Sequence, residues 1–145
     1  MEKWKLYAVA SAFFAGITAI LAKAGLKTLP ADLALVVRTI FVLLFVAIPV
    51  LATSGMTSAS LELRQAGVRA WGLLALSALA TALSWVCYYR AVKEGSVSTV
   101  ALIDKGSIVV TLVLAAVFLG EAFTWRMALG AALVVSGLLV LVPVK

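Results

Sequence analysis

Five apolar segments, each long enough to cross a lipid bilayer as a helix, constrain this chain more than any other feature. A membrane-spanning helix needs roughly 20 mostly apolar residues, and such segments lie near residues 6–26, 31–53, 69–89, 97–119 and 127–144. With 65% hydrophobic residues, 12% charged residues and a mean hydropathy of +1.19, the chain lies outside the range of soluble domains. We therefore expect an all-α membrane protein with five transmembrane helices in a single domain over residues 1–145.

The composition excludes several classes of function. The net charge of +6 comes from scattered Lys and Arg residues that form no basic run or helix face, so we expect no nucleic-acid partner. The chain has no His and no group of intramembrane acids, so we expect no metal site, no cofactor and no catalytic centre. Cys87 is alone, which excludes an internal disulfide. The first apolar segment continues to Lys23 without a clear cleavage site, and we interpret it as a retained span.

The Lys and Arg residues outside the spans are balanced between the two membrane surfaces. The N-terminal surface carries five of them, namely Lys3, Lys5, Arg64, Arg69 and Arg126. The opposite surface also carries five, namely Lys23, Lys27, Arg90, Lys93 and Lys145. Because an excess of these charges normally sets orientation, the balance predicts insertion in both orientations and an antiparallel homodimer in the lipid bilayer. The alternative is a parallel assembly whose orientation is set by another feature.

Polar side chains recur at helical spacing within two of the spans. Residues three, four and seven apart share one face of a helix. The third span has such a stripe in Ser77, Thr81, Ser84 and Tyr88, and the fourth has one in Asp104, Ser107 and Thr111. These stripes predict the lining of a polar cavity. The alternative is that the hydroxyl groups bond to neighbouring backbone or hold helices together.

Charged side chains also lie inside the spans, where they usually mark a pathway. Arg38 and Asp104 each lie about seven residues into a span, so both sit on the order of 10 Å below the same surface, and we expect them to pair. Lys105 lies about 100° further round the helix and faces a different partner. Alternatively, Lys105 and Lys23 extend to the lipid headgroups. As the acidic residue placed deep in a span, Asp104 is the candidate proton carrier.

The fifth apolar segment is rich in small residues. Gly130 and Gly137 lie seven residues apart on one helix face, and such faces allow helices to approach closely. This spacing predicts that the two glycines lie in the seam of a dimer. The alternative is packing against other helices of the same subunit.

The order of these segments resembles a known family. The stretches YAVASAFFAGITAILAKAGL, RAVKEGSVSTVALIDKGSIVVTLVLAAVFLGE and TWRMALGAALVVSGLLVLV are similar to an EamA domain, the repeat unit of the drug/metabolite transporter superfamily. In such repeats the third span ends near an Arg-Ala pair, here Arg90 and Ala91, and the fourth closes on Leu119, Gly120 and Glu121. The resemblance implies one half of a ten-helix basket built from inverted repeats. Because this chain carries one such repeat, the resemblance implies that two copies form the basket as a homodimer.

The same resemblance implies a function. Members move small metabolites, amino acids or drugs across the bacterial inner membrane, so we expect an alternating-access transporter of a small molecule in a bacterial or archaeal inner membrane. The cations Lys23, Arg38 and Lys105 favour an anionic or zwitterionic substrate. Related small multidrug exporters use a Glu in the first span, whereas this first span has Lys23 and no acid. The alternative to transport is an accessory or scaffold membrane subunit.

Overall fold

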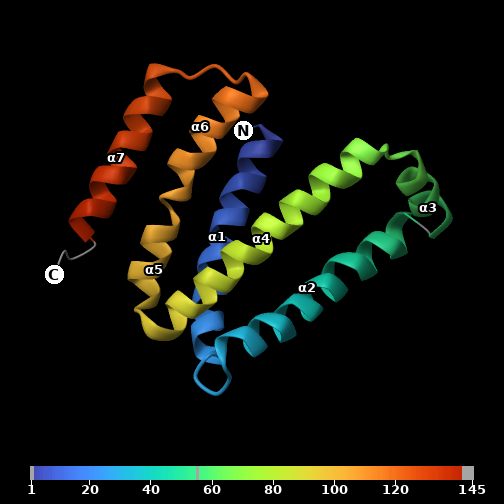
Figure 1. Ribbon diagram of the computed structural model, residues 1–145, viewed down its shortest axis with the longest axis horizontal. Helices are drawn as coiled ribbons and strands as arrows, with labels where there is room; N and C mark the ends of the chain where they lie inside the picture. The colour runs from blue at the N-terminus through green and yellow to red at the C-terminus, as the bar shows by residue number, and fades with distance from the viewer. Residues whose placement is uncertain (1, 55, 142–145) are drawn as a thin grey trace. The chain divides into compact units, whose positions relative to one another are not determined.

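All regular secondary structure described in this protein is helical. The computed structural model describes residues 2–54 and 56–141. Its helices, shown in Figure 1, are α1 (Lys3–Gly25), α2 (Ala31–Ser54), α3 (Met56–Gln65), α4 (Val68–Glu94), α5 (Val97–Asp104), α6 (Ser107–Leu119) and α7 (Trp125–Leu141). The all-α prediction is therefore confirmed for the described residues. The predicted end of the fifth span at Val144, and Lys145, lie outside them.

Four stretches of the described chain are long and apolar enough to cross a membrane. They are Lys3–Gly25, Ala31–Thr53, Val68–Glu94 and Val97–Leu119, the last of which contains both α5 and α6. The fifth predicted span corresponds to α7, a shorter apolar helix of 17 residues. A fifth crossing therefore remains a prediction.

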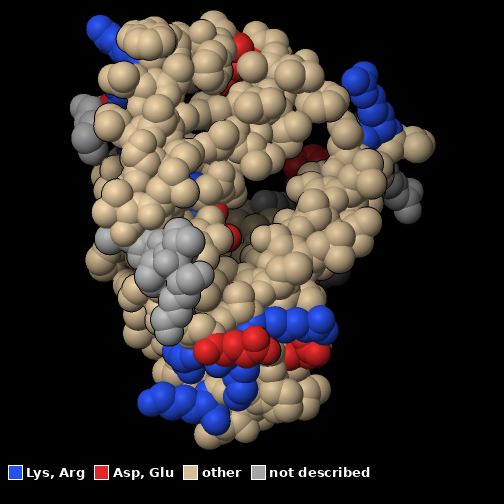
Figure 2. Space-filling model, turned by 60° about the vertical axis from the view of Figure 1, so that its left-hand side comes forward, with Lys and Arg blue, Asp and Glu red and all other residues tan. Residues whose placement is uncertain are grey.

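Apolar side chains face outward along these helices. Phe13, Phe45 and Leu74 are each more than 60% exposed, and Figure 2 shows uncharged residues over most of the face in view. A water-soluble domain does not expose apolar surface on this scale. The exposed side chains therefore indicate a lipid environment or contact with other helices.

The chain forms two compact units. Unit 1 is Met1–Lys23 together with Glu94–Lys145, and unit 2 is Ala24–Lys93. The single domain expected over residues 1–145 stays a prediction.

In unit 2, the start of α2 lies beside the end of α4. Asp32 in the first turn of α2 accepts two hydrogen bonds from Arg90, at 3.1 Å to Nε and 3.2 Å to Nη2. The buried residues of the unit belong to the same ends of these helices and to the connection before α2: Leu26, Leu35, Tyr89 and Val92. The two long helices are thus fastened together at one end.

The connection between α2 and α4 contains a further helix. It is the ten-residue helix α3. Its second half is rich in Leu, Glu, Arg and Gln, which have high helix propensity. The hydrogen bond from the Ala66 N–H to the Glu62 carbonyl, at 3.1 Å, closes its last turn.

In unit 1, the fourth apolar span is interrupted near its middle. Helix α5 ends at Asp104, Lys105 and Gly106 form a turn, and α6 begins at Ser107. Across the turn, hydrogen bonds join residues three apart, from Lys105 N–H to Leu102 O at 3.0 Å and from Gly106 N–H to Ile103 O at 2.9 Å. The turn is therefore a tighter coil than the helices on either side.

Two glycines shape the path from α5 to α7. A Cβ atom at Gly106 would lie 3.0 Å from the Ile103 carbonyl oxygen and 3.8 Å from Cδ1 of Leu138 in α7, so the turn approaches α7 closely. Gly120 ends α6 in the left-handed region, with φ 65° and ψ 22°. This confirms the predicted end of the span at Leu119.

Candidate functional site

Arg38 is held against aromatic side chains inside unit 2. Its guanidinium carbon lies 4.4 Å from the centre of the Trp85 ring and 6.0 Å from that of Tyr89. Both aromatic residues belong to the C-terminal half of α4, whereas Arg38 is in α2. Stacking on an aromatic face leaves the N–H groups at the edge of the guanidinium group available to an acceptor.

The Nη1 atom of Arg38 is buried and has no hydrogen-bond partner among the described residues. A buried donor of a charged group without an acceptor is costly, and it is normally satisfied by an anion, a carbonyl group or water. Arg38 therefore presents an unsatisfied positive group at a defined place between two helices.

A cavity of about 630 Å³ lies between α2 and α4. Its lining from α2 is Leu35, Val36, Thr39 and Ile40. Its lining from α4 is Leu74, Ser77, Ala78, Thr81, Ala82, Trp85 and Val86. Trp85 belongs both to this lining and to the stack on Arg38, whereas Arg38 itself is not among the lining residues.

The hydroxyl groups of the cavity are bonded to the backbone of their own helices. Thr39 donates to the Leu35 carbonyl at 2.8 Å, and Thr81 donates to the Ser77 carbonyl at 2.9 Å. Each hydroxyl oxygen keeps lone pairs that can accept a hydrogen bond from the cavity. The two interpretations of the α4 stripe, cavity lining and backbone bonding, thus both apply to Thr81.

Only part of the predicted α4 stripe belongs to this cavity. Ser77 and Thr81 line it, whereas Ser84 and Tyr88 are not among its lining residues. The Tyr88 ring instead lies beside Tyr89, with 6.4 Å between ring centres.

The predicted stripe of the fourth span is divided by the turn in unit 1. Asp104 is the last residue of α5, and Ser107 and Thr111 lie in the first two turns of α6. The expected directions of Asp104 and Lys105 assumed a continuous helix, whereas α5 ends at Asp104 and Lys105 lies in the turn. Asp104 and Lys105 are both exposed at the turn. Since Arg38 belongs to unit 2 and Asp104 to unit 1, their pairing remains a prediction.

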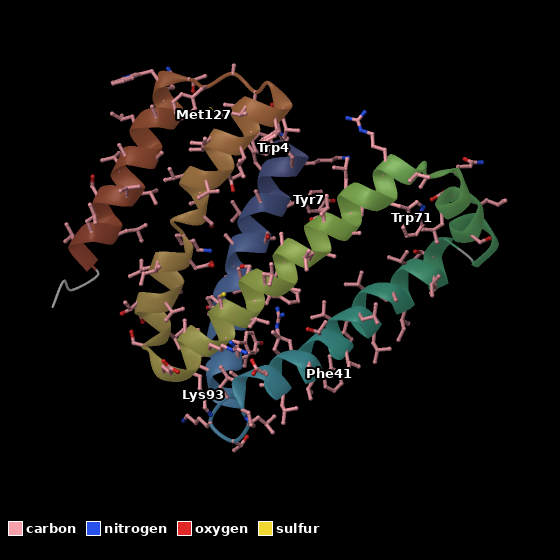
Figure 3. The ribbon with its side chains drawn as sticks, viewed as in Figure 1. Trp4, Tyr7, Phe41, Trp71, Lys93 and Met127 are labelled. Atoms are coloured by element: carbon pink, nitrogen blue, oxygen red, sulfur yellow. The ribbon has the colours of Figure 1, made fainter. Side chains whose placement is uncertain are left out.

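Three basic residues have contacts that the sequence analysis missed. Besides Arg90 with Asp32, Lys93 in unit 2 donates to the carbonyl groups of Leu26 and Leu29, the second at 3.0 Å. Figure 3 shows Lys93 at the end of α4 near the connection between α1 and α2. In unit 1, Lys23 donates to the Gly95 carbonyl at 3.0 Å.

The sequence feature that could have predicted these contacts is the position of the charged residues near helix ends. Basic side chains near the last turn of a helix readily bond free carbonyl groups, and an acid in a first turn readily meets a base from a neighbouring helix end. In the sequence analysis, Lys23, Arg90 and Lys93 were used only to predict membrane orientation, so their contacts at helix ends were not predicted. No three His, Cys, Asp or Glu side chains gather into a metal-binding group within residues 2–54 and 56–141.

The sequence matches a family of transporters and is similar to a protein named as an uncharacterized transporter. Residues 2–142 match the EamA-like transporter family. A Sinorhizobium sp. protein described as an uncharacterized transporter in the cobO 3′ region is 39% identical over 140 residues, which cover 97% of this chain and 96% of that protein. No solved structure matches the chain. The family match covers nearly the whole chain, so this protein belongs to the EamA-like transporter family, within the drug/metabolite transporter superfamily.

Proposed function

We propose that this membrane transporter moves a small metabolite or drug across the inner membrane of a bacterium or archaeon by alternating access. The observation that carries the proposal is the interruption of the fourth apolar span at Asp104, Lys105 and Gly106. Secondary transporters commonly bind substrate or coupling ions where a membrane helix is interrupted. Here two charged side chains lie at the break.

We further propose that the transporting unit is an antiparallel homodimer of oppositely inserted copies. Two such copies would supply the inverted repeats that alternating access requires. The equal numbers of Lys and Arg at the two surfaces support dual insertion. The Sinorhizobium relative, 96% of which is covered, also has about the length of one repeat.

The proposed dimer seam is the face of α7 that carries Gly130 and Gly137. A Cβ atom added at either glycine would meet no described atom within 4 Å, in contrast to Gly106. Of the partly buried positions of α7, Ala128, Ala131 and Leu138 lie on other faces, and Val134 lies between the two glycines on theirs. The glycine face is therefore open to a helix from a second copy.

The proposed substrate path follows the polar and charged side chains of α2, α4, α5 and α6. Its members are Arg38, Ser77, Thr81, Ser84, Tyr88, Asp104, Lys105, Ser107 and Thr111. Ser77 and Thr81 contribute through the cavity that they line. Asp104 is the proposed proton carrier, since its carboxyl group lies in an apolar span beside a break in the helix. The mechanism needs no metal or cofactor.

Reconstitution tests transport directly. Purified protein in liposomes should accelerate the flux of a substrate chosen from a panel of small metabolites, and an imposed pH gradient should drive it. An accessory or scaffold subunit would give no flux with any member of the panel.

Orientation is tested separately. A cysteine placed at each terminus, in a background with Cys87 replaced by Ser, should react with an impermeant maleimide from both sides of the membrane. Labelling of each terminus from one side alone would exclude dual insertion.

A further inference from the structure

We infer that the cavity between α2 and α4 binds a small neutral aromatic compound that carries a hydrogen-bond donor, such as an aromatic alcohol. The inference rests on the proposed function in one respect, because it takes the bound molecule to be a transported substrate. The site itself is built from contacts within unit 2. Its parts are uncharged walls, hydroxyl oxygens from two helices and the ring of one tryptophan.

The walls of the cavity carry no charge. None of the 11 residues that line it is Asp, Glu, Lys or Arg. Arg38 is not among them, and its Nη1 atom is buried, so this atom is not available to a ligand in the cavity. A charged molecule would therefore lie against these walls without a counterion, and burying an unpaired charge is costly. The cavity should select a neutral molecule, in contrast to the anionic or zwitterionic substrate that the intramembrane cations suggested.

Two threonine hydroxyl groups from different helices make the cavity a site for a hydrogen-bond donor. Thr39 of α2 donates its proton to the Leu35 carbonyl at 2.8 Å, and Thr81 of α4 donates to the Ser77 carbonyl at 2.9 Å. Because each proton is already used, the two oxygens can only accept a bond from a ligand. Both threonines are exposed residues of the lining. A lipid acyl chain has no donor for these oxygens, whereas an O–H or N–H group does.

Trp85 gives the cavity an aromatic wall. The guanidinium carbon of Arg38 lies 4.4 Å from the centre of the Trp85 ring, and this contact holds the ring in position. Since Arg38 does not line the cavity, the ring borders it with surface that Arg38 does not cover. At about 630 Å³ the cavity falls within the range of pockets that hold small organic ligands. An aromatic body gains contact with the aliphatic walls and an aromatic pair with Trp85.

Binding can be followed through Trp85. In protein whose Trp4, Trp71 and Trp125 are replaced by Phe, the remaining tryptophan fluorescence comes from this lining residue. The probes are 3-phenylpropanol, its methyl ether, 3-phenylpropionate and 3-phenylpropylamine, which share an aromatic body and differ in donor and charge. Measurements are made in nanodiscs of zwitterionic phosphatidylcholine, and empty nanodiscs correct for partitioning of each probe into the lipid.

We expect 3-phenylpropanol to change the Trp85 fluorescence saturably. It should bind roughly 2- to 10-fold more tightly than its methyl ether, as one hydrogen bond between neutral groups implies. The carboxylate and the amine should each bind at least roughly 10-fold more weakly than the alcohol, because the walls offer neither of them a counterion.

Three variants separate the walls from the acceptor. Ala78→Phe fills the cavity from α4 and should abolish the saturable response to both neutral probes. Ala80→Phe, the matched control, makes the same change at an exposed position of α4 outside the lining and should leave the response intact. Thr81→Val removes one acceptor, so it should lower the affinity for the alcohol towards that for the ether and leave the ether unaffected.

Several results would overturn the inference. A response to the alcohol that rises without saturation, and is the same in Ala78→Phe, would mean that the cavity holds lipid chains only. Equal affinities for the alcohol and the ether would exclude the hydroxyl groups as acceptors. Tighter binding of the carboxylate or the amine than of the alcohol would refute the selection of neutral molecules, and this comparison needs no folded variant.

Flux measurements separate this inference from the proposed function. Proteoliposomes that transport some other substrate while 3-phenylpropanol fails to bind would refute the site and leave transport standing. Binding with the expected preferences but without flux of any tested molecule would support the site and refute transport.

Discussion

The left-handed cap at Gly120 allows a stability change to be calculated from the structure. Gly120 has φ 65°, a conformation that costs an L-residue with a Cβ atom about 1–2 kcal/mol. An added Cβ would meet no described atom within 4 Å, so crowding adds nothing to this cost. Gly120→Ala should therefore lower the free energy of unfolding by about 1–2 kcal/mol.

Gly16→Ala provides the matched control in the same unit. Gly16 lies within α1, and a Cβ there would also meet no described atom within 4 Å. Because Ala exceeds Gly in helix propensity, this variant should gain about 0.5–1 kcal/mol. The two alanine variants should thus differ by roughly 2 kcal/mol in the free energy of unfolding.

The assay is reversible unfolding in mixed micelles, with far-UV circular dichroism recorded as the fraction of sodium dodecyl sulfate rises. Gly120→Asn should fall between wild type and Gly120→Ala, because Asn enters the left-handed region more readily than Ala does. Equal stability of Gly120→Ala and wild type, alongside the expected gain in Gly16→Ala, would refute the left-handed cap.

Three further predictions concern function and assembly. Asp104→Asn should abolish pH-driven transport in proteoliposomes at normal expression, and unchanged proton dependence would exclude Asp104 as the carrier. Gly130→Leu should shift a crosslinked dimer towards monomer by blocking close helix approach, whereas Gly16→Leu should not; an undiminished dimer fraction would argue against the seam. Asp32→Arg should lower the melting temperature in detergent by breaking the ion pair with Arg90, and adding Arg90→Asp should restore it. Failure of the exchanged pair to recover stability would mean that this contact does not fasten α2 to α4.

The sequence located most ends of the long helices closely, but α4 continues to Glu94, beyond the end of the third span predicted at residue 89. Apolar length fixes where a span can lie, and the Leu119–Gly120 junction marked the end of the fourth span because Gly readily adopts the left-handed cap. Arg38 was likewise predictable as a candidate site residue, because a charged side chain within an apolar segment is costly unless it has a partner or a function.

The break at Lys105 and Gly106 was not predicted, because the apolar segments on both sides of it form one continuous hydropathy signal. What distinguishes the site is local: a glycine follows two charged residues, and a Cβ at that position would crowd the Ile103 carbonyl. The Trp85 stack was also missed. It depends on how α2 and α4 approach each other, and helical spacing within one segment contains no information on that approach.

The interrupted span has a mechanical consequence for α5. This helix has eight residues and is about 12 Å long, so a tilt of about 15° at the Lys105–Gly106 turn would displace its far end by about 3 Å. That far end follows Gly95, whose carbonyl group accepts the hydrogen bond from Lys23 of α1. One end of α5 therefore lies at the turn beside α7, and the residue that precedes its other end is hydrogen-bonded to α1. Asp104 is the last residue of α5, so protonation of its carboxyl group would act at the turn, where a small tilt of α5 displaces the other end of this helix.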